Sequence, residues 1–176
     1  MYSSECPRNY NFHTMTDLYK ANLLHSALYL DRAGRAQNLY LRGGEDAIHG
    51  VQIFEQEWPN VQRGQAWSAR MLEKDDTVAD ICSMYPEACI YLLNLKVHPS
   101  LIINWLEQAL SSAKRKSNSA QEKKILGFLG LPYLHLGDLQ SAIGFFQDYL
   151  AICIQDKDRN GESAALANLG VVSFPG

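Results

Sequence analysis

Apolar residues recur three and four positions apart along most of the chain, and this spacing predicts helices. The first such run extends from Leu18 through Leu30 and continues to Leu41, with Thr16 as its expected N-cap. It must stop at Gly43-Gly44, because glycine adopts a positive φ at little cost. No segment alternates apolar and polar residues as a strand would, so we predict an all-α fold.

Three further helices are predicted before residue 87. One runs from Glu45 to Trp58 and ends at Pro59, because proline removes a backbone donor and clashes with the preceding turn. Asn60 is the expected cap of the next, which continues to Met71. Asp75-Asp76-Thr77 then starts a short helix that ends at Tyr85-Pro86.

The C-terminal half nearly repeats itself after forty residues. Leu126-Gly127-Phe128-Leu129-Gly130 corresponds to Leu166-Ala167-Asn168-Leu169-Gly170, and Ile102 to Leu106 corresponds to Ala142 to Phe146. Self-similarity at such a period indicates stacked supersecondary units. We assign a flexible arm to 1–13, a helical segment to 14–86 and repeats to 87–176. Within the repeats, 87–118 is degenerate, 121–158 is clear and 161–174 is a half repeat.

The clear repeat resembles the tetratricopeptide repeat. The resemblance is carried by Leu-x-x-Leu-Gly at 126–130, Tyr133, Leu136-Gly137-Asp138, Ala142 and Phe146. The linker Asp158-Arg159-x-Gly161-Glu162 resembles the forty-residue variant of bacterial regulators and animal spindle-orientation adaptors. The resemblance implies a right-handed solenoid of antiparallel helical hairpins with a concave groove that binds a partner's peptide or helix.

These residue types also have a physical reason to be there. Gly130 and Ala142 are small enough for two helices to approach closely, Phe146 fills the gap between them, and Asp138 can cap the second helix. Pro132 departs from the pattern, and we expect it to bend its helix.

The N-terminal half is similar to the segment that precedes repeats in bacterial signalling ATPases of the NB-ARC/STAND type. Arg42-Gly43-Gly44-Glu45, Phe54-x-x-Glu57-Trp58-x-Asn60 and Gly64-Gln65-Ala66-Trp67 carry this similarity. No G-x-x-x-x-G-K-[ST] phosphate loop occurs in the chain. The alternative function is therefore a detached sensor or regulatory arm of such an ATPase.

Composition and motifs exclude several classes of function. A formal charge of −3 gives no general attraction to nucleic acid or to an anionic membrane. The sequence has no catalytic elbow, no dinucleotide fingerprint and no cysteine or histidine pairs at metal-ligand spacing, so we predict no enzyme activity, no cofactor and no metal. An enzyme with a diffuse site stays as the third alternative. The absence of a signal peptide and the unpaired cysteines predict a cytoplasmic protein.

The predicted function is that of a non-enzymatic protein-protein interaction module. By the resemblance, the first helix of each repeat lines the groove, which assigns Lys124, Phe128, Leu131, Leu134, Asn168, Val171 and Phe174 to peptide binding. Asn168 matches the family asparagine that hydrogen-bonds a bound peptide's backbone. The alternative for Leu131 and Val171 is that they are core residues.

The last helix raises a separate expectation. Leu166, Leu169, Val172 and Phe174 form an apolar stripe on helix 161–174, and no predicted helix follows to cover it. An uncovered stripe favours association or indicates a shortened array, so we expect the last helix to pack on another copy, as self-association through helix 161–174, or on the N-terminal arm. Trp58, Trp67 and Trp105 lie on predicted apolar faces, which is typical of core packing.

Overall fold

The described part of the chain is helical. The computed structural model describes residues 12–173 of the 176-residue protein, and this range contains no strand, which confirms the all-α prediction. The described range holds seven helices: α1 (Phe12–Arg42), α2 (Gly44–Met71), α3 (Asp76–Lys96), α4 (Pro99–Arg115), α5 (Ser119–His135), α6 (Leu139–Asp156) and α7 (Arg159–Ser173).

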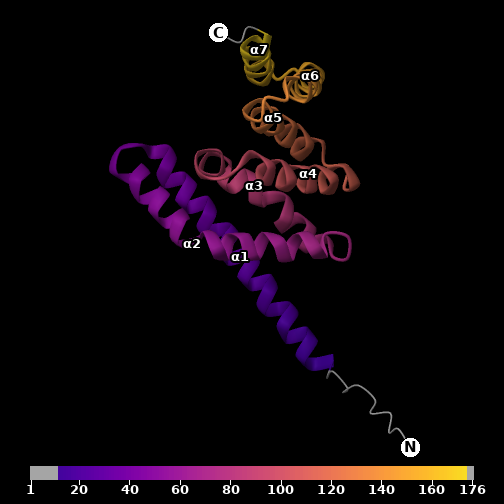
Figure 1. Cartoon of the computed structure of the whole chain (residues 1–176). Helices are drawn as coiled ribbons and strands as arrows, with labels where there is room; N and C mark the ends of the chain where they lie inside the picture. Colours follow the sequence, from indigo (N-terminus) through magenta and orange to yellow (C-terminus); the bar gives the residue numbers. More distant parts are fainter. Residues whose placement is uncertain (1–11, 174–176) are drawn as a thin grey trace, which may run out of the picture.

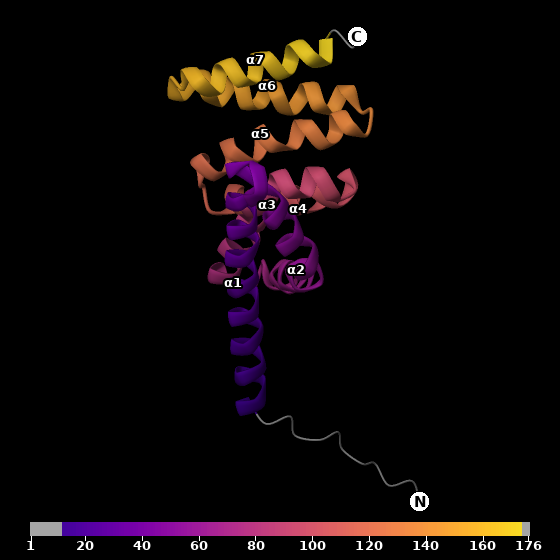
Figure 2. The same ribbon diagram turned by 90° about the vertical axis from the view of Figure 1, so that its left-hand side faces the viewer.

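The helices form a hairpin and a stack. Helices α1 and α2 lie side by side as a long hairpin, and α1 also packs against α3. From α3 to α7 each helix packs against the next in the chain, and α7 lies at the far end of the stack (Figures 1 and 2). The predicted stop at Gly43-Gly44 is confirmed, since both residues have a positive φ, +77° and +58°.

Helices α4 to α7 begin twenty residues apart. Four residues spaced at this interval each use their side chain to accept a hydrogen bond from a backbone N–H in the first turn of the next helix. The acceptor–donor pairs are His98 and Ser100 (3.3 Å), Asn118 and Gln121 (3.1 Å), Asp138 and Ser141 (3.1 Å), and Asp158 and Gly161 (3.0 Å). Equal spacing gives the helices nearly equal length and the same register.

The turns before three of these caps are also alike. Ser117, Gly137 and Lys157 have left-handed backbone conformations, with φ of 52°, 79° and 58°. In each turn the next residue's N–H bonds to a carbonyl five residues back, as Asp138 does to Tyr133 at 3.1 Å. This hydrogen bond is the Schellman closure, which satisfies the free carbonyls at a helix end.

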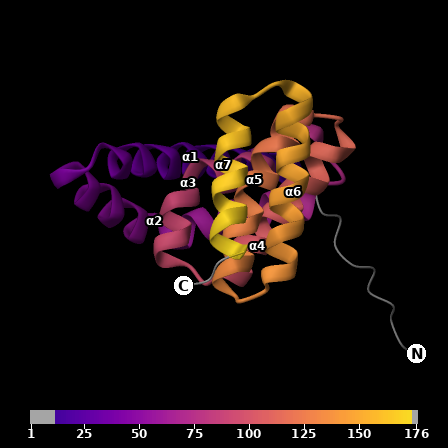
Figure 3. The same cartoon turned by 90° about the horizontal axis from the view of Figure 1, so that it is seen from above.

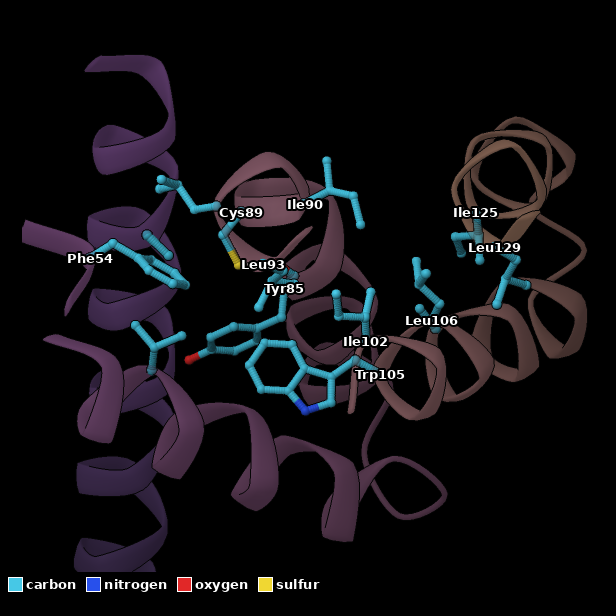
Figure 4. Close-up of a cluster of buried hydrophobic side chains, with 14 of the residues drawn as sticks. Phe54, Tyr85, Cys89, Ile90, Leu93, Ile102, Trp105, Leu106, Ile125 and Leu129 are labelled. Atoms are coloured by element: carbon cyan, nitrogen blue, oxygen red, sulfur yellow. Dashed lines mark hydrogen bonds between the residues drawn. The ribbon is translucent and has the colours of Figure 1, made fainter. Parts of the chain in front are cut away.

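Tyr85 is the centre of the core. Its side chain is fully buried, and its hydroxyl donates a hydrogen bond to the Ser26 carbonyl in α1 at 2.7 Å. Figure 4 shows the hydroxyl pointing toward α1, with the ring beside Trp105. In α2, Gly64 leaves room for this hydroxyl, because any side chain there would overlap it. One tyrosine therefore joins α1, α2 and α3.

The tryptophans extend this core, as predicted. Trp105 is 2% exposed, and its ring lies 6.0 Å from that of Tyr85 and 5.7 Å from that of Trp58. Trp67 packs edge-on against Tyr19 at 5.6 Å. The aromatic contacts thus connect α2 with α3, α4 and α1, and their geometry is that of ordinary core packing.

The close approach predicted for the clear repeat is present between α5 and α6. A side chain at Gly130 would overlap the Phe146 ring, and both Ala142 and Phe146 are fully buried. Pro132 lies in the last turn of α5, which continues to His135. A second small cluster forms here from Ala142, Phe146 and Val172.

Two predicted helix boundaries in the N-terminal half are wrong. Thr16 lies inside α1, which already begins at Phe12; residues 12 and 13 of the predicted arm therefore belong to α1, and the rest of the arm lies outside the described residues. Pro59 lies inside α2, and Asn60 caps nothing. The helix continues because Pro59 is exposed, so water can reach the carbonyl it leaves free, while buried Phe54 and Val61 hold both sides.

Pro86 also fails to end its helix, and the predicted boundary between 86 and 87 falls within α3. The helix starts as predicted, with Asp75 as its cap, but bends at Cys89, whose φ of −142° and ψ of 20° are not helical. The bend separates the Glu87 carbonyl from the Tyr91 N–H, which an unbroken helix would pair. Gln37 of α1 bridges them: its Nε2 donates to the Glu87 carbonyl at 3.0 Å, and its Oε1 accepts from Tyr91 N at 2.9 Å.

The left-handed turns predict opposite effects at two equivalent positions. Gly137→Ala should lower the free energy of unfolding by about 1 kcal/mol, because a Cβ is strained at this φ. Lys157→Gly should raise it by up to about 1 kcal/mol, because it removes that strain from an exposed position. Urea unfolding measures both changes, and shifts in the same direction would contradict the turn assignment.

The Gln37 bridge predicts that an isosteric substitution of Gln37 lowers the free energy of unfolding. Gln37→Met keeps the volume but leaves a partly buried carbonyl and N–H without partners, so the free energy of unfolding should fall by about 2 kcal/mol. Hydrogen exchange at the Tyr91 amide should accelerate as well. Gln52→Met, at an exposed position of α2, is the control and should have little effect. Equal stabilities of the two variants would exclude the bridge.

Candidate functional site

A groove of about 790 Å³ lies where α1 crosses α3 and the beginning of α5. Residues from these three helices and from the turn before α5 line it: Ala27, Leu30, Asp31, Gly34, Arg35, Gln37, Asn38, Asp80, Ser83, Met84, Glu87, Ala88, Asn118, Gln121 and Lys124. The bend of α3 contributes Glu87 and Ala88, so the Gln37 bridge fixes one wall of the groove against another.

Ion pairs surround the groove. Lys124 of α5 pairs with Glu87 of α3 at 2.8 Å, and Arg35 pairs with Asp31 along α1 at 2.8 Å. Asp80 pairs with Lys116. All these side chains are at least a quarter exposed, so the pairs contribute little to stability and can exchange partners with a bound ligand.

The inner surface of the groove is partly apolar. Met84 is 51% exposed there, next to Ala88, and α1 adds Leu30. Helices α1 and α3 are close at Gly34, where an added Cβ would make an ordinary van der Waals contact with the Ala88 Cβ at 3.9 Å. An apolar inner surface with paired charges at its edges is suited to an apolar side chain on a polar chain, such as a peptide.

A second, smaller hollow of about 440 Å³ lies between α2 and α4. Three of its carboxamides satisfy one another: Gln65 donates to Gln108 at 2.7 Å, and Gln108 donates to Asn104 at 3.2 Å. Because these groups are already hydrogen-bonded within the protein, the hollow offers fewer free contacts to a ligand than the groove does.

Among the residues that the sequence assigned to the groove, Lys124 lines it. Phe128 is half-buried and packs on the main core instead. Leu131 and Leu134 are half-buried and pack around Ala142 and Phe146. For Leu131, this position corresponds to the core alternative left open by the sequence.

The assigned residues of α7 lie away from the groove described above. Asn168 is half-buried and Val171 is 61% exposed, both on the helix at the far end of the stack. Phe174 lies outside the described residues. The predicted stripe on this helix divides: Val172 and Leu169 pack in the second small cluster, whereas Leu166 is 57% exposed.

Sequence analysis missed the wall formed by α1. Asp31, Gly34 and Arg35 lie in a helix for which the repeat pattern gives no partner, so no periodic signal pointed to them. Met84 and Glu87 were missed because Pro86 suggested a helix end between them.

Shifted pKa values occur outside the groove and have structural causes. Burial raises the pKa of the Cys82 thiol to about 11. The Tyr19 hydroxyl donates to Asp75 and, with the Val78 N–H, holds the pKa of that carboxyl below its usual value. At Asp158, the Gly161 N–H and the Lys123 ammonium lower the carboxyl pKa. Such carboxylates stabilise helix starts rather than perform proton transfer.

No group of three or more histidine, cysteine or acidic side chains within 12–173 could hold a metal ion. In the same range, no helix has the combination of length and apolar character needed to cross a membrane. The chain matches no family model, no curated protein and no solved structure.

The Asp158 cap predicts an acid-sensitive contribution to stability. Its folded-state pKa is lowered, so the contribution is present above the unfolded-state pKa and is lost as pH falls through the folded value, below about 4. Asp158→Asn keeps a cap acceptor but removes the titrating charge, so its melting temperature should fall less between pH 5 and pH 3 than that of the wild type. Asp148→Asn, at an exposed position of α6, serves as control; a steeper fall for Asp158→Asn would contradict the assignment.

Proposed function

We propose that α3 to α7 form a short right-handed solenoid of helical hairpins of the tetratricopeptide kind. In this proposal the protein is a non-enzymatic interaction module that holds a partner's peptide or helix in the groove between α1, α3 and α5. The observation that carries the proposal is the groove itself, which has a partly apolar inner surface and exposed, exchangeable ion pairs at its edges.

Burial patterns support the repeat assignment. Pairs of residues forty apart are buried in both members: Cys89 and Leu129 in the first helices, and Leu106 and Phe146 in the second helices. Ile125 in α5 and Ala165 in α7 are a third such pair. Equal burial at a fixed interval is expected when successive hairpins stack in one register.

The groove suggests the chemistry of the partner. Met84, Leu30 and Ala88 favour one apolar side chain, and the paired charges at the edges, Arg35 with Asp31 and Lys124 with Glu87, favour polar or charged groups beside it. A preformed groove limits the ordering cost to the partner. We therefore infer that the partner segment carries an apolar residue flanked by polar or charged ones.

A pull-down from the native cell, with quantified affinity for each captured protein, tests this proposal. Met84→Glu places a charge on the apolar surface and Lys124→Glu reverses the edge charge, so each should weaken the partner at least about tenfold. Ile48→Glu is the matched control, because Ile48 is an exposed apolar residue of α2 outside the groove, at 62% exposure.

Each other outcome of this experiment would change the assignment. If Asn168→Ala releases the partner while Met84→Glu keeps it, the partner lies along α5 and α7, as the family resemblance implies. If every variant retains it, the groove assignment is wrong. Co-purification of a nucleotide-binding protein would favour the regulatory-arm alternative over a free adaptor.

A further inference from the structure

The outer face of α7 is apolar, uncharged and uncovered by any other described helix. Leu166 and Val171 are 57% and 61% exposed, and Ala167 and Gly170 are exposed beside them. No charged residue occurs from 163 to 173. Figures 2 and 3 place α7 at the end of the stack, with α6 beside it and no helix over it.

The equivalent face of α5 is covered, and its cover is α6. Leu126, forty residues before Leu166, is 4% exposed. Gly130, forty residues before Gly170, lies directly under the Phe146 ring, so closely that a Cβ would overlap it. At Gly170, by contrast, no other group lies within 4 Å of the Cβ position. Helix α7 thus repeats a surface that α5 uses to hold an aromatic side chain.

The inner face of α7 fixes the register of this comparison. Ala165 and Val172 are buried, as are Ile125 and Pro132 forty residues earlier in α5. Val172 packs with Ala142 and Phe146 of α6, and Ile125 packs in the main core cluster with Leu106 of α4, so the outer face of α7 corresponds to the face that α5 presents to α6. The agreement extends along the helix and does not depend on the glycine alone.

We propose that the outer face of α7 binds an amphipathic helix of another protein, and that this helix places a large aromatic side chain on Gly170. The helix would resemble α6, with a phenylalanine one turn after an alanine, as Phe146 follows Ala142, and an uncharged inner face. A second copy of this chain is a poorer occupant: its Phe146 is already fully buried, and the described residues of its α7 include no aromatic. This site is separate from the groove between α1, α3 and α5.

A synthetic peptide of residues 138–157, the α6 segment, is the probe. Labelled, and stapled between positions 147 and 151, which are exposed in α6, it is titrated against the full chain by fluorescence anisotropy. We expect saturable binding with a Kd on the order of micromolar. Phe146→Ala in the peptide should weaken binding at least about tenfold, because the aromatic side chain is the anchor.

Two protein variants separate the α7 face from other modes of binding. Gly170→Leu fills the hollow and should weaken the peptide at least about tenfold. Gly144→Leu is the matched control, since it changes another exposed helical glycine with nothing within 4 Å, and should leave binding unchanged. Leu166→Glu provides a second test of the same face, and circular dichroism melts verify that each variant is folded.

Several results would overturn the proposal. One such result is the absence of saturable binding up to about 1 mM peptide. Another is equal binding of the peptide to the wild type and to Gly170→Leu, which would mean that the peptide displaces α6 or binds elsewhere. Sedimentation that reveals a dimer abolished by Gly170→Leu, without competition from the peptide, would assign the face to a second copy instead. Met84→Glu should not affect this binding, so its outcome is independent of the groove proposal.

Discussion

The spacing of the turns is the constraint on which the stack depends. Each of the caps at His98, Asn118, Asp138 and Asp158 starts a helix twenty residues after the previous one, and three of them follow a left-handed turn that ends the helix before. Since both the start and the end of each helix are fixed by local hydrogen bonds, every helix presents its apolar face at the same rotation. Each helix can then pack on the next with an equivalent set of contacts.

The N-terminal half is organised differently, because α2 and α3 are long helices that continue past Pro59 and Pro86. In α3, Pro86 is followed by a bend at Cys89, and the backbone groups opened there find partners in the side chain of Gln37. This bridge joins the long hairpin to the stack. It also sets the angle at which α1 crosses α3, and that crossing forms the groove.

Much of the stack was predictable from sequence because its determinants are local. The all-α class, the Gly43-Gly44 stop, the cap at Asp75 and the contact of Gly130 with Phe146 all depend on residues close together or on a repeated pattern. The sequence predicts the forty-residue repeat. It does not predict the twenty-residue spacing of the helix caps, because His98 occupies a cap position at which the later helices have asparagine or aspartate.

The groove was largely missed for a physical reason. Its residues come together where Gln37 compensates a broken helix fifty residues further along the chain, and propensity rules treat Pro59 and Pro86 alike as helix ends. Whether a proline ends a helix depends on what receives the carbonyl that it leaves free. At Pro59 the side chain is exposed, so water can hydrogen-bond to the free carbonyl. At Pro86 the side chain is buried.

The way in which α7 begins explains why one of its faces is exposed. Its start is fixed by Asp158, which accepts the Gly161 N–H and pairs with Lys123 of α5, so the helix is held in the register of α5. A helix held in this register must present Leu166 and Gly170 where α5 presents Leu126 and Gly130. The exposed face is therefore a consequence of the turn geometry, and a helix shaped like α6 is the object that this geometry fits.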